Sequence, residues 1–246
     1  MTWLLKQFDV EAVIVDLDGT MVDTVDDFVL ALNAMLTELR PPYRSHRVDR
    51  ATVARLVGKG SEHLIRSVLS WVRAASAGTD PDLDEDRCGD LYEQAWQSYQ
   101  RHYLAINGLH AVVYPGVLAG LRQLKGHGLK LACLTNKPTA FALPLLKAKG
   151  LAGFFEFAFG GDAFERKKPD PLPLLKTCQA LGTAPKRTLM IGDSINDAQA
   201  ARAAGCPVLL VTYGYNHGAP IRAVDADAFA DSLDALIQPH SGSDPF

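Results

Sequence analysis

Cysteine is scarce in this sequence and follows no recognisable pattern. The chain contains four cysteines, none of them in a closely spaced pair. Zinc sites and disulfide frameworks both need cysteines at short, regular spacings, so the sequence favours neither. The seven histidines are also scattered and include no pair four residues apart. We therefore expect reduced thiols, as in a cytoplasmic protein, and assign no histidine to a metal site.

The sequence also lacks long apolar runs and an excess of basic charge. No stretch approaches the roughly 18 uninterrupted apolar residues of a membrane span, and the opening MTWLLK does not read as a signal peptide. The formal net charge is −3, so no broad positive surface is expected to attract nucleic acid or an anionic membrane. We expect a cytoplasmic monomer or homodimer of 246 residues, long enough for one α/β domain with a smaller insert.

A short apolar segment near the start runs into two acids. Residues 12–15 read AVIV, which is typical of a strand buried on both faces, and Asp16 and Asp18 follow. An unpaired carboxylate is costly inside a core, so both acids are expected at the carboxyl end of the strand, with their side chains on the same side. They could then act on one metal ion or one phosphoryl group. The alternative is a strand that runs into an acidic glycine turn.

The rest of the chain divides into a helical stretch and an alternating one. Between residues 22 and 108, helical spacing occurs at 25–39, 63–71 and 91–106, residues 76–90 read as a loop, and no segment from 43 onward is a convincing strand. Later, strand patterns at 129–134, 155–159, 188–191, 208–212 and, weakly, 225–230 alternate with helices at 117–125, 139–149, 171–181, 195–204 and 232–237. This alternation predicts a parallel sheet. We expect an α/β, Rossmann-like core of residues 1–21 and 109–246, with an all-helical domain of residues 22–108 inserted after the first strand.

Polar residues gather at the carboxyl ends of the predicted core strands. The strands run into Asp16-Leu17-Asp18, Thr135-Asn136, Gly160-Gly161-Asp162 and Gly192-Asp193. Because these ends share one edge of a parallel sheet, residues far apart in sequence are expected to meet there. Several acids at one edge would repel one another without a cation. Asp16, the backbone carbonyl of Asp18 and Asp193 are expected to form the inner ligand shell of Mg²⁺.

Two further groups complete this predicted site. Asp197 falls about one helical turn after Asp193 and is expected behind it, while Ser194 or Asp193 could instead cap the helix at 195–204. Lys168 could hold a phosphate and offset the acids, whereas the neighbouring basic residues could simply be solvated. The Thr135 hydroxyl and the backbone N–H of Asn136 suit phosphate oxygens.

The motifs resemble those of a known superfamily. DLDGT at 16–20, TN at 135–136, KP at 168–169 and GDSxxD at 192–197 resemble the four ordered motifs of the haloacid dehalogenase superfamily, and jointly they are highly specific. TNKPTAF at 135–141, KKPDPLPLL at 167–175 and GDSINDAQAARAAGCP at 192–207 resemble the bacterial phosphoglycolate phosphatases within it. The likeness covers the core almost throughout and is weaker in the helical insert.

The resemblance implies Mg²⁺-dependent hydrolysis of a small phosphorylated metabolite, 2-phosphoglycolate, to glycolate and phosphate. It makes Asp16 the nucleophile that forms an aspartyl-phosphate, and Asp18 the general acid and then the general base. It implies that Thr135 and Lys168 bind the phosphoryl group during its transfer, and that Asp16, Asp18 and Asp193 bind the Mg²⁺ that offsets its charge.

The resemblance further implies that the helical insert is a mobile cap over the site. Its Gly58-Lys59-Gly60 turn could reach the carboxylate of the substrate, because glycines let the backbone approach a ligand closely. The alternative is that Lys59 is an exposed loop lysine.

Other activities fit the sequence to different degrees. A dehalogenase need not keep an acid two residues after the nucleophile, and phosphonate-cleaving relatives typically lack it, so Asp18 argues against both. A sugar-phosphate mutase of the β-phosphoglucomutase type keeps both acids and a helical cap, and it stays open beside other small-phosphomonoester phosphatases. A phosphate-sensing protein without catalysis would need a broken motif, and none is broken here.

Overall fold

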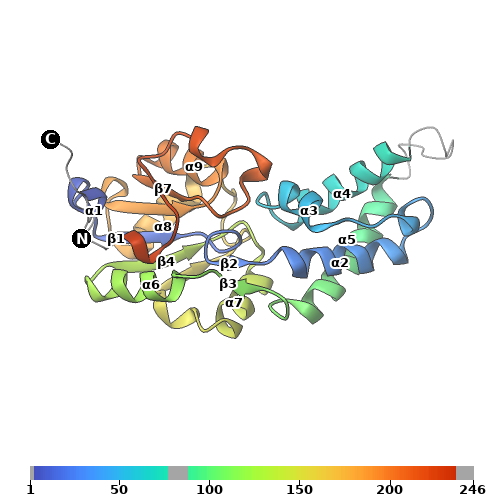
Figure 1. Cartoon of the computed structure of the whole chain (residues 1–246), viewed down its shortest axis with the longest axis horizontal. Coiled ribbons are helices and arrows are strands. Elements are labelled where there is room, and N and C mark those ends of the chain that lie inside the picture. The colour runs from blue at the N-terminus through green and yellow to red at the C-terminus, as the bar shows by residue number, and fades with distance from the viewer. Residues whose placement is uncertain (1–2, 77–87, 237–246) are drawn as a thin grey trace.

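The computed structural model describes residues 3–76 and 88–236. It has two lobes, one α/β and one helical, as Figure 1 shows. Two short strands, β2 (Val22–Asp23) and β3 (Val112–Val113), pair antiparallel where the chain passes from one lobe to the other and back. The sequence did not predict this pair, and β2 begins at the expected first residue of the all-helical insert.

The α/β lobe is built on a six-stranded sheet whose pairings are all parallel, as predicted. Its order is β5-β4-β1-β6-β7-β8, with bounds β1 Ala12–Val15, β4 Lys130–Leu134, β5 Phe157–Phe159, β6 Thr188–Gly192, β7 Val208–Val211 and β8 Ala228–Ala230. From β1 the sheet is extended to one side by β4 and β5 and then to the other by β6, β7 and β8. The carboxyl end of β1 therefore lies at a topological switch point, where open α/β sheets form ligand crevices.

Helices cover both faces of this sheet, and alternate residues of β1 enter different cores. The helices of the lobe are α1 Trp3–Gln7, which the sequence did not predict, α6 Val117–Gly126, α7 Thr139–Ala148, α8 Leu172–Leu181 and α9 Ile195–Ala204. Val13 and Val15 pack into the core that includes residues of α6 and α7. Ala12 and Ile14 pack into the core that includes residues of α8 and α9. The fully buried AVIV segment thus joins two hydrophobic layers, as its unbroken apolar pattern predicts.

The helical lobe has a separate hydrophobic core. The helices of this lobe are α2 Val25–Glu38, α3 Arg50–Leu56, α4 Ser61–Ala75 and α5 Cys88–Ile106. Leu32, Met35, Ile65, Val68 and Tyr99 are among its fully buried side chains. Between residue 43 and residue 108 the described part of the chain contains no strand, as expected.

The structure corrects the ends of several predicted elements. Of the edge strand expected at 225–230, only Ala228–Ala230 is a strand, and the carboxylates of Asp225 and Asp227 before it form ion pairs with Arg202. The helix expected at 232–237 is a 3₁₀ turn at Asp234–Leu236 in the described residues. Most of the loop expected at 76–90 lies outside the described residues, and its last three residues belong to α5.

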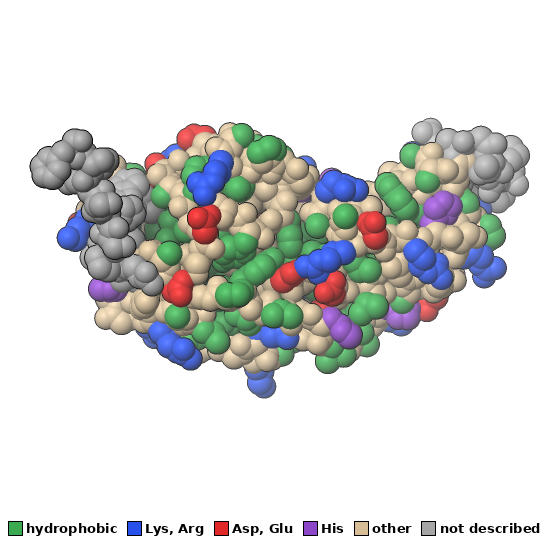
Figure 2. All heavy atoms as spheres, viewed as in Figure 1, with side chains coloured by type: hydrophobic (Ala, Val, Ile, Leu, Met, Phe, Trp, Pro, Cys, Tyr) green, Lys and Arg blue, Asp and Glu red, His purple; other side chains and the backbone are tan. Residues whose placement is uncertain are grey.

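The described surface carries charges of both signs. On the face drawn in Figure 2, Lys and Arg side chains lie among Asp and Glu and, outside the grey atoms, form no continuous basic patch. In the described chain no helix is long and apolar enough to span a lipid bilayer.

Candidate active site

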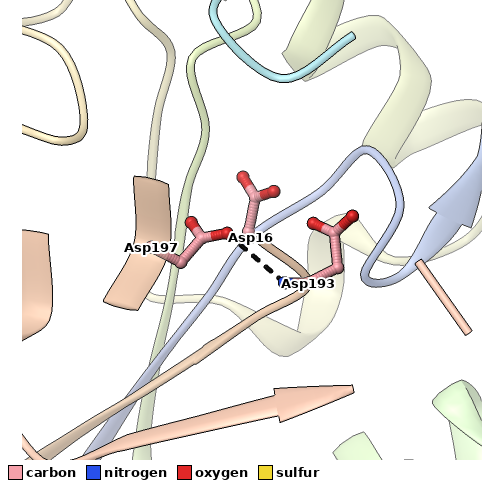
Figure 3. Close-up of side chains that lie close together, drawn as sticks. All are labelled: Asp16, Asp193 and Asp197. Carbon is pink, nitrogen blue, oxygen red and sulfur yellow. Dashed lines mark hydrogen bonds between the residues drawn. The ribbon is translucent and has the colours of Figure 1, made fainter. Parts of the chain in front are cut away.

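Three buried carboxylates meet where β1 and β6 end. Asp16 directly follows β1, Asp193 directly follows β6, and Asp197 lies in the first turn of α9. Figure 3 shows their carboxylates gathered together, and one oxygen of each lies within 4.8 Å of the others. The parallel sheet has thus brought together residues from both ends of the chain, as the polar strand ends predicted.

Lys168 is the cation of this group. Its Nζ donates hydrogen bonds to Asp16 Oδ1 at 2.8 Å, to Asp197 Oδ1 at 2.7 Å and to the carbonyl oxygen of Leu134 at 2.9 Å. Burial opposes the charged form, but Asp16 and Asp197 outweigh it and raise the pKa of Lys168 above its ordinary value. Lys168 is therefore a fixed ammonium with all three of its protons directed at protein oxygens.

The three carboxylates carry more negative charge than Lys168 offsets. Burial raises the pKa of Asp16 to about 7, although Lys168 opposes this. Burial, and then the charges of Asp197 and Asp16, raise the pKa of Asp193 well above its usual range. A divalent cation would relieve this repulsion, and a buried donor set made only of oxygens fits a hard ion such as Mg²⁺. These residues can therefore hold a metal ion.

Asp197 is bound by Lys168 through one carboxylate oxygen and by the start of α9 through the other. Oδ1 accepts from Lys168, and Oδ2 accepts from the backbone N–H of Asp193 at 3.3 Å (dashed in Figure 3), from the N–H of Ser194 at 3.2 Å and from its hydroxyl at 2.8 Å. Asp197 thus closes the first turn of α9, and its place behind the inner metal ligands stays a prediction. Ser194 caps α9 together with Asp197, which is the alternative role that the sequence left open for it.

Asp193 is held from two sides. Its Oδ1 accepts a hydrogen bond of 3.2 Å from the Thr20 hydroxyl, and its Oδ2 accepts one of 2.7 Å from the backbone N–H of Tyr215. The backbone beside it must be glycine, because a Cβ on Gly214 would lie 2.1 Å from the Asp193 Cβ. The TYGYN segment at 212–216, which follows β7, also resembles the phosphoglycolate phosphatases, but sequence reasoning assigned no role to Gly214 or Tyr215.

Asp18 lies in the same pocket but outside the carboxylate group. Its Oδ1 accepts from the Thr24 hydroxyl at 2.8 Å and from Lys137 Nζ at 3.1 Å, and the same Nζ lies 3.3 Å from Oδ2. Lys137 is buried, and its Nζ also lies 2.5 Å from the Tyr103 hydroxyl. Sequence reasoning missed Lys137. The available signal was its place directly after Thr135-Asn136, at the end of a predicted strand.

The pocket between the lobes contains most of the predicted site residues. The α/β lobe contributes Asp16, Asp18, Thr135, Asn136, Lys137, Lys168, Asp193, Ser194, Asp197, Tyr215 and Asn216, and the helical lobe contributes Phe28, Val57, Gly58, Gly60, Ser61 and Leu64. Thr135 is 3% exposed, and its hydroxyl oxygen accepts from the backbone N–H of Lys137 at 3.2 Å. Asp162, at the end of β5, is not in this pocket, because its carboxylate accepts from the N–H and hydroxyl of Thr139 at the start of α7.

The glycine turn of the helical lobe reaches the α/β lobe through its backbone. The carbonyl oxygen of Gly58 accepts hydrogen bonds from the side-chain amides of Asn136 at 3.0 Å and Asn196 at 3.3 Å. Gly58 and Gly60 have φ of 119° and 90°, which glycine adopts without strain. Lys59 between them is exposed and does not line the pocket, so its contact with a substrate carboxylate stays a prediction.

The fold and site agree with the comparison with known proteins. A family model described as haloacid dehalogenase-like hydrolase matches residues 10–205. The chain belongs to this family. The hydrolase is 43% identical over 224 residues to a phosphoglycolate phosphatase of Thiobacillus denitrificans, a match that covers 91% of this chain and 92% of that protein. It is 42% identical to a plasmid-encoded phosphoglycolate phosphatase of Cupriavidus necator, over 92% of this chain and 90% of that protein.

A solved structure shows the same arrangement. The crystal structure of a predicted phosphoglycolate phosphatase from Haemophilus somnus superposes on the hydrolase with a TM-score of 0.84 at 31% identity, covering 93% of this chain and 96% of that one. The likeness therefore includes both the α/β and the helical lobe.

Proposed function

We propose that this hydrolase converts 2-phosphoglycolate to glycolate and inorganic phosphate. The observation that carries the proposal is the placement of Asp16, at the end of a buried strand, beside Lys168 and in a pocket lined from both lobes. The substrate is suggested by relatives at about 40% identity that are named phosphoglycolate phosphatases.

The chemistry follows in two balanced steps. A carboxylate oxygen of Asp16 attacks phosphorus, the bond from phosphorus to the glycolate oxygen breaks, and the carboxyl group of Asp18 gives its proton to that oxygen. Water then attacks the phosphorus of the aspartyl-phosphate and gives a proton to Asp18. Phosphate leaves and the Asp16 carboxylate is restored. Lys168 and Thr135 hold the phosphoryl oxygens during both transfers.

Mg²⁺ is the proposed cofactor. We assign it to Asp16, Asp193 and the backbone carbonyl of Asp18, with Asp197 and Ser194 behind them, because Lys168 occupies one oxygen of Asp197 and the first turn of α9 occupies the other. When bound, a divalent cation offsets the charge of the phosphoryl group that is being transferred.

The helical lobe is proposed to act as a cap. In this interpretation residues 1–21 and 109–246 form the catalytic core and residues 22–108 close over it, so that water is excluded while the first transfer takes place. The contacts of the Gly58–Gly60 turn with Asn136 and Asn196 support this assignment.

Phosphate release by the purified protein tests the proposal. We expect hydrolysis of 2-phosphoglycolate that needs Mg²⁺ and stops in excess chelator. Turnover of β-glucose 1-phosphate to glucose 6-phosphate with no phosphate released would instead identify a mutase, and no turnover of any phosphomonoester would refute the proposed activity.

A further inference from the structure

Two lysines line the described pocket, and they have different partners. All three protons of Lys168 are directed at Asp16, Asp197 and the backbone of Leu134, on the side where the phosphoryl group is transferred. Lys137 contacts none of Asp16, Asp193 and Asp197 through a hydrogen bond in the described structure. Its Nζ is shared between the carboxylate of Asp18 and the hydroxyl of Tyr103.

The donor geometry of Lys137 leaves capacity for a further acceptor. An ammonium group has three protons. One is directed at the Tyr103 hydroxyl, and the two longer contacts, of 3.1 and 3.3 Å, both go to the carboxylate of Asp18, so that one of them can be exchanged for a substrate oxygen while Asp18 keeps the other. The aromatic rings of Phe28 and Tyr103, with centroids 4.5 and 4.7 Å from Nζ, fix the group in place without accepting a conventional hydrogen bond.

The chemistry of the proposed substrate places its carboxylate beside Asp18. Asp18 must reach the ester oxygen in order to protonate it. In 2-phosphoglycolate a single methylene group separates that oxygen from the carboxyl carbon. A cation in direct contact with Asp18 is therefore within reach of the substrate carboxylate, and Lys137 is in that position.

The helical lobe adds an anion-binding element at the same pocket. α4 has 15 residues, and its first residue, Ser61, is 6% exposed and lines the pocket beside Gly60. The first N–H groups of a helix have no partner within it, and its dipole favours a negative charge there. Ser61 also supplies a hydroxyl group.

We infer that the substrate carboxylate is bound between the Lys137 ammonium of the α/β lobe and the first turn of α4 at Ser61 of the helical lobe. The inference rests on the proposed function and makes it specific for short phosphorylated carboxylic acids. It also replaces Lys59 as the carboxylate-binding lysine, since the side chain of Lys59 is exposed and outside the pocket lining. A carboxylate bound in this way contacts both lobes and so links substrate choice to their closure.

The test compares two substrates of matched length. One is 2-phosphoglycolate, and the other is 2-hydroxyethyl phosphate, which has an alcohol in place of the carboxylate. The measured quantity is the specificity ratio, kcat/KM for 2-phosphoglycolate divided by kcat/KM for 2-hydroxyethyl phosphate. We expect Lys137→Met to lower kcat/KM for both substrates, because Asp18 loses its lysine partner. We also expect it to lower the specificity ratio by at least about tenfold, mainly by raising KM for 2-phosphoglycolate. Ser61→Ala is expected to lower the same ratio by about threefold or more while the contacts of Asp18 stay intact.

Two further variants separate the alternatives. Lys59→Met tests the sequence-based interpretation, and Lys167→Met is the control for an exposed lysine near the same turn. The inference predicts a ratio within about twofold of the unmodified enzyme for both. A specificity ratio that falls by about tenfold or more in Lys59→Met would overturn the inference, and so would a ratio that is unchanged in both Lys137→Met and Ser61→Ala. Failure of the unmodified enzyme to hydrolyse 2-phosphoglycolate would instead refute the proposed function.

Folding is checked separately, because Lys137 is buried. Circular dichroism and thermal unfolding of each variant establish that it is folded before its kinetics are compared. If Lys137→Met does not fold, Ser61→Ala decides by itself: a preserved ratio in that variant overturns the inference, and a lowered one supports it.

Discussion

The side-chain amide of Asn136 joins the two lobes at the pocket by donating a hydrogen bond of 3.0 Å to the carbonyl oxygen of Gly58, 78 residues earlier in the chain. The same side chain is hydrogen-bonded to the backbone of Lys168. Its Nδ2 donates to the Lys168 carbonyl oxygen at 2.8 Å, and its Oδ1 accepts from the Lys168 N–H at 3.0 Å. One amide thus positions Lys168 and also holds the glycine turn of the helical lobe.

Asn136→Ala is expected to impair both functions of this side chain. It leaves buried backbone groups of Lys168 without partners, which costs about 1–3 kcal/mol in the free energy of unfolding. We expect kcat/KM to fall by about ten- to a hundredfold, measured by phosphate release beside urea unfolding. Asn196→Ala is the matched control, because it removes a bond to Gly58 without touching Lys168. Equal effects of the two variants would contradict a separate role in positioning Lys168.

Asp16→Asn is expected to abolish turnover with little loss of stability. The amide keeps the shape of the carboxylate but is a very poor nucleophile, so kcat should fall by at least about a thousandfold. Single-turnover assays with freshly purified protein, checked by mass spectrometry for deamidation, measure this. Activity within about tenfold of the unmodified enzyme would rule out the covalent mechanism.

Metal removal provides an independent test of the acid group. We expect a chelator to eliminate activity and added Mg²⁺ to restore it, because the ammonium group of Lys168 offsets only part of the charge of the three buried carboxylates. Asp193→Ala should raise the Mg²⁺ concentration needed for half-maximal activity by at least about tenfold, or prevent recovery altogether. Full activity of the unmodified enzyme in excess chelator would show that the group does not use a metal.

Gly214→Ala is expected to disturb the metal site without altering a ligand. The new methyl group would lie 2.1 Å from the Asp193 Cβ, so the carboxylate or the segment carrying Tyr215 must move. We predict a higher Mg²⁺ requirement and a lower kcat, since metal affinity depends on how its ligands are held. Gly153→Ala is the control, because a Cβ there meets no atom within 4 Å. An unchanged Mg²⁺ titration in Gly214→Ala would show that Asp193 is not held by this contact.

Much of the fold follows from local pattern. The AVIV segment predicted a strand buried on both faces, and the alternation of apolar segments after residue 114 predicted a parallel sheet. Because side chains at the carboxyl ends of parallel strands share an edge, Asp16, Thr135 and Asp193 could be placed together before any coordinates were known. The acid and glycine motifs then pointed to phosphoryl transfer and to a family that the comparisons confirm.

Other features were decided only by the tertiary structure, because they depend on side chains that meet across the fold. Asp162 had the same sequence signal as Asp193, yet it caps α7, since β5 lies at the edge of the sheet, separated from β1 by β4. Sequence reasoning singled out Lys59, between two glycines, and gave Lys137 no role. Packing against the rings of Phe28 and Tyr103 buries Lys137 in the pocket, whereas Lys59 stays exposed to solvent. Sequence predicted which residues gather at the strand ends, and long-range packing determined which of the described lysines line the pocket.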